Sequence, residues 1–284
     1  MKFEVLEPQT VDEALSLLSA NPEETRVIAG GQSLLLMIRS GLLMPRFLVS
    51  LNALTELSQI RRTTGNRIHI GSTVTHRQVL SSPIISEAAG LLAQAVFRIG
   101  STPVRNFGTL GGNLCHNEMG SDPPPALLAL DASVECASSR GRRQLPIREL
   151  FTGYFETCLA ADEMLVGIEI PAHSMGGVYL KHALRGGDLA IAGVAAAATL
   201  HDGACSDLRI AVGGVGPVPF RLDKAESLLN GKSWRADMID EAAAIAADAC
   251  DPISDAHASA DYRRKMARVF VKRALQQLSD NSSQ

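Results

Sequence analysis

Two glycine-rich segments of the sequence have the composition of backbone sites for phosphate. The first glycine segment, residues 29–33, reads AGGQS, and the second glycine segment, residues 109–113, reads TLGGN. Glycine has no Cβ and adopts positive φ readily, so a ligand can approach its backbone closely. Successive N–H groups in such a turn form a concave site for anions, and a helix start adds the positive end of its dipole. Together the two segments predict one ligand held from both sides. A diphosphate is the obvious candidate, because backbone N–H groups of neutral glycine loops can bind its oxygens without a cluster of Arg or Lys.

Two features limit this prediction for the first glycine segment alone. It fits equally an ordinary tight turn in which Ser33 caps the following helix. It also lacks the Lys of a P-loop and the Gly-x-Gly-x-x-Gly pattern of a dinucleotide-binding Rossmann fold. The second segment, which we expect to lie in a turn as well, favours the ligand.

Cys115, His116 and Glu118 follow the second glycine segment and suggest a metal site as the alternative. If this stretch is extended, Cys115 and His116 point to opposite faces and cannot easily share one ion. No second His or Cys pair has a metal-like spacing. The sequence therefore predicts no metal site, and it places Cys115 and His116 against the same ligand or in the core.

Two further polar groups have both a structural and a functional interpretation. Asp122 precedes three prolines, so it is either a hydrogen-bond partner for a ribose or ribityl hydroxyl or the N-cap of a helix beginning at the prolines. Lys181, Arg185 and Asp188 lie near an expected strand end, where a solvated polar turn is the simpler interpretation.

The composition excludes several classes of protein. The chain has 284 residues, a formal net charge of -3 and 46% hydrophobic residues, so it has a core but no basic field for nucleic acid or an anionic membrane. Its five cysteines are scattered and never spaced Cys-x-x-Cys, which argues against disulfides or an iron–sulfur cluster of its own and for a cytoplasmic protein. No apolar stretch reaches the roughly 20 residues of a membrane span, and the first residues lack a secretory signal pattern.

The elements that must position these residues follow from periodicity and turn signals. The first glycine segment joins the strand RVI to the helix QSLLLMIRSG, and the strand RFLVSL follows, which predicts a parallel βαβ unit. Hairpins at IRRTTGNRIHIG and ASVECASSRGRRQLPI flank one helix whose apolar face runs from Ile85 to Ile99, and EMLVGIEIP is a strand. Antiparallel strands and then a helical bundle complete an α+β chain, with domains at residues 1–175 (lobes about 1–55 and 56–175) and 176–284.

The sequence resembles the FAD-binding medium subunits of the molybdenum hydroxylases over nearly its whole length. AGGQSLLLMIRSGLLMPRFLVSLN and VRNFGTLGGNLCHNEMGSDPPPALLALDASVE match the two flavin loops of that family, and EMLVGIEIP and KHALRGGDLAIAGVAA match later segments in the same order. The resemblance implies an N-terminal flavin domain of two α/β lobes and a C-terminal antiparallel sheet with helices. It implies these FAD contacts: Ala29, Gly30, Gly31, Gln32, Ser33, Thr109, Leu110, Gly111, Gly112 and Asn113 at the pyrophosphate; Asp122, with His116 adjacent, at the ribityl or ribose; Ile99, Gly100 and Leu165 at the isoalloxazine; and Lys181 near the ring or its entry path.

The function implied by the resemblance is electron transfer. The molybdenum cofactor and the [2Fe–2S] clusters would belong to a large and a small partner subunit, in a dimer of heterotrimers, and FAD in this chain would pass electrons to an external acceptor. No catalytic residue is predicted. A stand-alone flavin oxidoreductase and a non-enzymatic nucleotide-binding or assembly module remain the alternatives.

Overall fold

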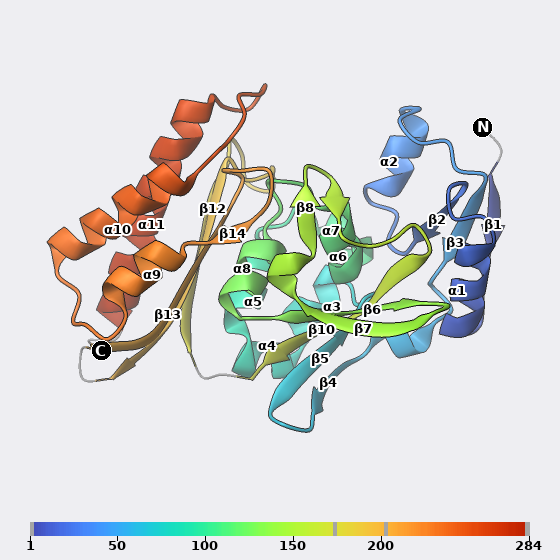
Figure 1. Cartoon of the computed structure of the whole chain (residues 1–284), viewed down its shortest axis with the longest axis horizontal. Helices are drawn as coiled ribbons and strands as arrows, with labels where there is room; N and C mark the ends of the chain where they lie inside the picture. Colours follow the sequence, from blue (N-terminus) through green and yellow to red (C-terminus); the bar gives the residue numbers. More distant parts are fainter. Residues whose placement is uncertain (1–2, 173–174, 202–203, 282–284) are drawn as a thin grey trace.

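The computed structural model describes residues 3–172, 175–201 and 204–281 as three regions along one axis (Figure 1). The N-terminal lobe has parallel strands in the order β1-β3-β2. Thr10 caps its first helix by accepting from the Glu13 N–H at 3.1 Å. Its elements are β1 (Glu4–Leu6), α1 (Val11–Ala20), β2 (Thr25–Ile28), α2 (Leu34–Arg39) and β3 (Phe47–Ser50). The predicted parallel βαβ unit is confirmed, and the short strand β1 extends it.

The second lobe is built on a five-stranded antiparallel sheet of order β4-β5-β10-β6-β7, covered by short helices. Its strands and 3-10 turns are η1 (Thr55–Ser58), β4 (Ile60–Thr63), β5 (Arg67–Gly71), β6 (Ser133–Ser138), β7 (Gly141–Pro146), η2 (Ile147–Glu149), β8 (Phe151–Gly153), β9 (Glu156–Thr157) and β10 (Glu163–Pro171). Its helices are α3 (His76–Ser81), α4 (Pro83–Ala88), α5 (Gly90–Phe97), α6 (Thr102–Phe107), α7 (Leu110–His116) and α8 (Pro123–Ala129). Both predicted hairpins form, as β4–β5 and β6–β7.

The apolar face from Ile85 to Ile99 belongs to two helices, so the prediction of one helix is wrong. Ala89 has φ -147° and ψ 40°, which is not helical, and it ends α4 before α5 begins at Gly90. The apolar spacing continues across this break because both helices pack on the same core.

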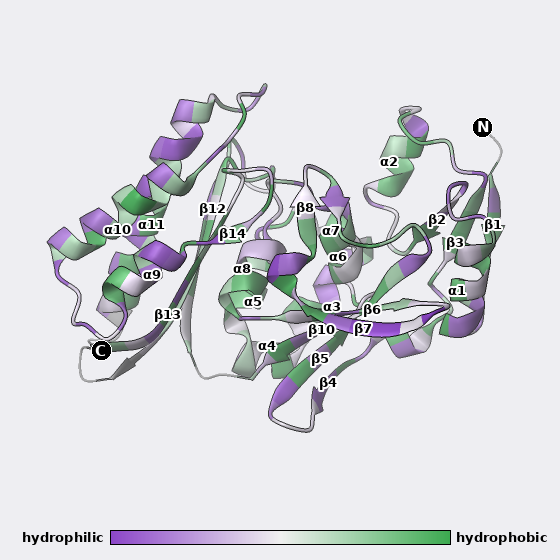
Figure 2. Ribbon diagram, in the orientation of Figure 1, coloured by the Kyte–Doolittle hydropathy of each residue, from purple (hydrophilic) through white to green (hydrophobic). Residues whose placement is uncertain are grey.

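Polar residues occupy an edge of the five-stranded sheet. The edge strand β7 is exposed at all but one of its positions, and Figure 2 shows it as hydrophilic. Arg142 and Arg143 on β7 pair with Glu135 at 2.9 Å and Glu163 at 2.7 Å. Charged edge strands disfavour pairing with another chain.

The C-terminal region is an antiparallel sheet of order β11-β12-β13-β14 between two helical layers (Figure 1). Along β12, Ala195 and Ala197 pack toward α5 and α8, whereas Val194, Ala196 and Ala198 pack toward the C-terminal helices. Both faces of β12 are therefore buried, which explains its Ala-rich sequence. The elements are β11 (Gly176–His182), β12 (Ala192–His201), β13 (Ala204–Gly213), β14 (Phe220–Arg221), α9 (Asp223–Leu229), α10 (Ala236–Ala249) and α11 (Ala260–Asn281).

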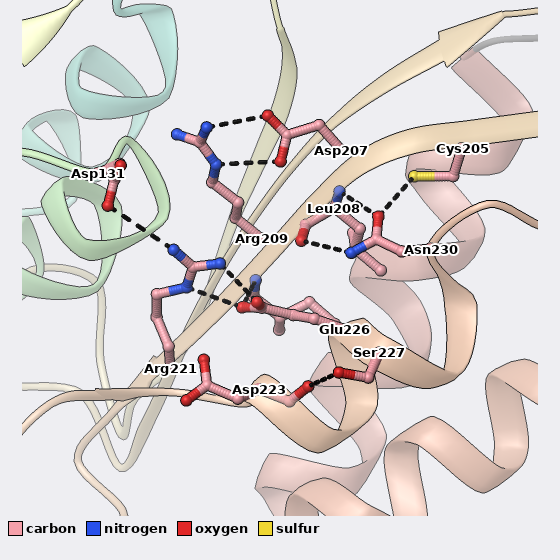
Figure 3. Close-up of polar contacts among 11 residues, drawn as sticks. Asp131, Cys205, Asp207, Leu208, Arg209, Arg221, Asp223, Glu226, Ser227 and Asn230 are labelled. Atoms are coloured by element: carbon pink, nitrogen blue, oxygen red, sulfur yellow. Dashed lines mark hydrogen bonds and ion pairs between the residues drawn. The ribbon is translucent and has the colours of Figure 1, made fainter.

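Polar contacts hold α9 against this sheet (Figure 3). The Glu226 carboxylate accepts from the Ile210 N–H at 2.8 Å and from Arg221 Nε at 2.9 Å. Arg221 also lies 3.8 Å from Asp131, which follows α8 in the second lobe. The buried charge of Glu226 is thus paired and hydrogen-bonded, as burial of a carboxylate requires.

No helix in the described residues combines the length and the apolar character that crossing a membrane requires.

Candidate functional site

The two glycine segments meet between the lobes. The first lies between β2 and α2, and the second begins just after α6. A Cβ at Gly30 would lie only 1.9 Å from the carbonyl oxygen of Phe107, and 3.0 Å from the Cα of Gly108. Only glycine permits this contact, and beside it lies a cavity of about 670 Å³ lined by both lobes. A volume of this size is typical of cofactor sites.

The cavity brings together most of the predicted site residues. Those in its lining are Ala29, Gly30, Gly31, Gln32, Ser33, Ile99, Thr109, Gly112, Asn113, His116 and Leu165. Those outside its lining are Gly100, Leu110, Gly111, Asp122 and Lys181.

The first glycine segment presents unpaired backbone donors. Gly31 has φ 67°, which turns the chain sharply into α2. Within the described residues, the N–H groups from Gly30 to Leu34 have no hydrogen-bond acceptor. The Ser33 side chain makes no capping bond to α2, so the hydroxyl is also available. Five successive free N–H groups at a cavity wall suit an anionic ligand.

The second glycine segment is helical, and the prediction that it lies in a turn is wrong. Thr109 is the N-cap of α7, and its Oγ1 accepts from the Gly112 N–H at 3.1 Å. The Leu110 and Gly111 N–H groups donate to the carbonyls of Val74 and Ser72 at 2.8 and 3.0 Å, and the Asn113 N–H donates to Thr109. Four N–H groups of this segment are therefore already used.

The glycines of the second segment have different surroundings. A Cβ at Gly111 would lie 2.6 Å from the Ser72 Cβ, so this glycine allows α7 to pack closely on the end of β5. A Cβ at Gly112 would meet only Thr109 Oγ1, at 2.7 Å, and Gly112 otherwise borders the cavity.

Cys115 and His116 lie in the helix α7, so the stretch is not extended. Both line the cavity, and the His116 ring lies 5.2 Å from the Phe155 ring, centroid to centroid. Burial raises the pKa of the Cys115 thiol to about 12. A thiol of this kind is a poor nucleophile. In the described residues, no group of three His, Cys, Asp or Glu side chains is arranged to hold a metal ion.

Asp122 takes part in a buried polar cluster outside the cavity lining. Its carboxylate accepts from the Tyr179 hydroxyl at 2.6 Å and from Lys181 Nζ at 2.8 Å. Asp122 is the N-cap residue of α8, as the helix-cap interpretation has it, but its side chain makes no capping bond to the helix. The Lys181 side chain is 5% exposed, so the interpretation of a solvated turn is wrong for this residue. Burial raises the pKa of Asp122, although Lys181 and Tyr179 oppose the shift.

Three polar residues of the lining were not predicted from the sequence. Thr25, Ser72 and His76 are 1%, 4% and 3% exposed, and all three border the cavity. Thr25 Oγ1, Ser72 Oγ and His76 Nδ1 have no hydrogen-bond partner among the described residues. No local motif marks them, because each stands singly at the end of a strand or the start of a helix. Buried polar atoms are almost always paired in folded proteins.

The cavity fits a cofactor with a phosphate chain and hydroxyl groups. The free N–H groups of the first glycine segment suit phosphate oxygens, and glycines 30 and 112 leave room beside the backbone. Thr25, Ser72 and His76 add three polar residues to the lining. The apolar residues Ile99, Met164 and Leu165 in the lining suit a planar ring system.

Comparison with known proteins finds flavoprotein families that match both halves of the chain. Residues 1–173 match the FAD binding domain in molybdopterin dehydrogenase, and residues 178–278 match the CO dehydrogenase flavoprotein C-terminal domain. The chain is 36% identical to the nicotine 6-hydroxylase medium subunit of Paenarthrobacter nicotinovorans over 94% of each chain. It is 35% identical to the carbon monoxide dehydrogenase medium chain of Hydrogenophaga pseudoflava over 96% of each. A solved carbon monoxide dehydrogenase from that organism superimposes with a TM-score of 0.95, covering 97% of this chain and 96% of the other.

Proposed function

This chain belongs to the FAD-binding medium subunits of the molybdenum hydroxylase family, and we propose that it binds FAD between its two lobes and relays electrons through it. The electrons come from [2Fe–2S] clusters of a partner subunit and go to an external acceptor. The observation that carries this proposal is the row of five unpaired N–H groups from Gly30 to Leu34 at the wall of the cavity.

The residues of the chain bind and orient the cofactor. The first glycine segment would hold the pyrophosphate against α7, with Thr109, Gly112 and Asn113 on the opposite side. Ile99 and Leu165 would border the isoalloxazine, with His116 near the ribityl chain. Asp122 and Lys181 lie outside the cavity lining and would act indirectly, by holding β11 against the start of α8.

FAD supplies redox chemistry when it is bound, and the protein determines its position and its access to water. The apolar wall of Met164 and Leu165, both 3% exposed, excludes water from one side of the cavity. Electron relay requires no general acid or base from this chain. Burial and the nearby Arg105 lower the pKa of His76 to about 4, so its imidazole is neutral near pH 7.

The partners in this proposal are a large molybdopterin-binding subunit and a small [2Fe–2S] subunit, assembled as a dimer of heterotrimers in the cytoplasm. Relatives of this chain are named as medium chains or complex subunits, which supports such an assembly. The five cysteines of this chain are free, and three of them are buried. A [2Fe–2S] cluster needs several cysteine ligands gathered at one place, so we place the clusters in the small subunit.

Two measurements test the proposal. The purified chain should show a flavin absorption spectrum, or regain one when the FAD-free protein is titrated with FAD. In the native complex, a variant of this chain that retains no FAD should leave the [2Fe–2S] signals formed by dithionite unchanged. It should abolish the reoxidation of these clusters by NAD, a quinone or oxygen. A colourless chain that cannot take up FAD would refute the proposal.

A further inference from the structure

We propose that the Phe155 ring forms part of the cavity wall and stacks on a planar ring of bound FAD, and that Asn117 is the positioning residue that holds it there. FAD has two planar rings, the isoalloxazine and the adenine, and an aromatic side chain stacks on either of them. This inference rests on the proposed function and adds an aromatic contact to it.

Phe155 lies in the turn between β8 and β9 and has a backbone conformation that bulky residues avoid. Its φ is 57°. The other non-glycine residues with positive φ in the described part of the chain are Asn66, Asn117 and Asp131, and Asn and Asp tolerate the left-handed region. A bulky side chain keeps this conformation only where its surroundings impose it, and such residues cluster at functional sites.

Asn117 imposes this conformation from the C-terminal end of α7. Its carbonyl accepts from the Phe155 N–H at 3.3 Å. Its side-chain amide donates to the carbonyls of Gly153 at 2.7 Å and Glu156 at 2.9 Å. Asn117 is itself fully buried, at 0% exposed. The turn that carries Phe155 is therefore fixed against α7, the helix that also carries His116.

The Phe155 side chain lines the cavity and is covered by little of the protein. It is 53% exposed and lies outside the hydrophobic cores of the described residues. Its ring is tilted by 53° against the His116 ring, which also lines the cavity. A large apolar ring left exposed in this way gains little from its own packing. A planar ligand in the cavity would remove it from water.

Substitutions of Phe155 separate the ring from the backbone strain. Phe155→Ala and Phe155→Gly both remove the ring and should weaken FAD binding about tenfold, as expected for loss of one stacking contact. In the FAD-free chain, Phe155→Gly should unfold at a higher temperature than Phe155→Ala, because glycine adopts positive φ without strain. Phe155→Tyr keeps the ring and should keep the FAD affinity of the wild type. Calorimetric titration with FAD and thermal unfolding measure these effects.

Tyr262→Ala is the matched control. Tyr262 is 41% exposed, and its ring is tilted against the His182 ring with the centroids 5.6 Å apart. Both rings lie outside the cavity lining. The FAD affinity of Tyr262→Ala should equal that of the wild type.

A double variant tests the role of Asn117. Asn117→Gly permits the positive φ but removes the two side-chain hydrogen bonds to the turn, so FAD binding should weaken. In the Phe155→Gly background the same substitution should have no further effect on FAD affinity, because the ring through which Asn117 acts is already absent. Losses of affinity that add in the double variant would contradict the positioning role.

Two competitors identify the ring of FAD that Phe155 contacts. ADP carries the adenine, and FMN carries the isoalloxazine. Phe155→Gly should weaken the binding of one of them about tenfold and leave the other unchanged. A loss for both competitors would indicate a general distortion of the cavity, and a loss for neither would leave no ring in contact, so either result would overturn this inference.

The remaining outcomes distinguish this inference from the proposed function. If the wild type itself binds no FAD, the proposed function fails. If the wild type, Phe155→Ala and Phe155→Gly bind FAD equally well, only this inference is overturned, and the exposed ring is then a surface for a partner subunit. A loss of affinity in Phe155→Tyr as large as in Phe155→Ala would also overturn it, because the ring is retained there.

Discussion

His76 is neutral in the folded chain because its surroundings disfavour a positive charge. Burial lowers the pKa of His76 from 6.5 to about 4, and the nearby Arg105 guanidinium contributes to the shift. A base whose pKa is lower in the folded state takes up its proton first in the unfolded chain. The contribution of neutral His76 to the free energy of unfolding is therefore fully present above pH 6.5 and is lost as the pH falls toward 4.

We expect this shift to be measurable as an acid sensitivity of the FAD-free protein. When the pH is lowered from 7 to 5, the free energy of unfolding of the wild type should fall by about 2 kcal/mol more than that of His76→Asn. The reason is that the Asn side chain at position 76 does not titrate. Urea denaturation of both proteins at the two pH values measures the difference. Equal losses would show that His76 titrates normally.

The two glycine segments have similar sequences but different backbone chemistry, and this difference could not be predicted. Both segments were recognised as sites of close approach from their glycines alone. Whether an N–H group is free depends partly on carbonyls elsewhere: Ser72 and Val74 accept two of the four hydrogen bonds that the second segment donates. Those carbonyls come from the end of β5 and the residues after it, and no local pattern specifies that contact.

The close contact at Gly30 yields a prediction for the start of α2. In Gly30→Ala, the methyl group would overlap the Phe107 carbonyl oxygen, so the first glycine segment must move away from α6. We expect FAD affinity to fall at least tenfold and the free energy of unfolding to fall by about 1–3 kcal/mol. FAD titration and urea denaturation measure the two effects.

Gly90→Ala is the control for this substitution. A Cβ at Gly90 has open space, and the residue begins α5 away from the cavity. FAD affinity should be unchanged, and stability unchanged or higher by about 0.4–1 kcal/mol. Wild-type affinity and stability in Gly30→Ala would mean that the lobes do not meet at this residue.

The buried cluster of Asp122, Tyr179 and Lys181 connects the flavin-binding half of the chain to the C-terminal sheet. Lys181 also donates to the Arg98 carbonyl at 3.1 Å, at the end of α5. Asp122 and Lys181 are 59 residues apart in sequence, so nothing local indicated that they form an ion pair. By contrast, many of the strands and helices could be predicted from hydrophobic periodicity, whereas the division into domains at residues 1–175 and 176–284 stays a prediction.

Lys181→Met should destabilise the whole molecule. It leaves the Asp122 carboxylate buried without its cation, which typically costs about 3–5 kcal/mol. Adding Asp122→Asn should restore part of the loss, because the buried charge is removed. Urea denaturation of the single and double variants measures this. The deficit of Lys181→Met should shrink as the pH falls, since protonation relieves the buried carboxylate. Wild-type stability of Lys181→Met would show that the cluster is not a structural link.

The unequal use of backbone donors in the two glycine segments has a consequence for how long the cofactor stays bound. The second segment is preorganised, because the N–H groups of residues 110–113 already have partners within the protein. The first segment must exchange water for ligand at five amides, so the ordering cost of binding is concentrated there. We therefore expect the residence time of the cofactor to respond more to substitutions in the first segment than to substitutions in the second.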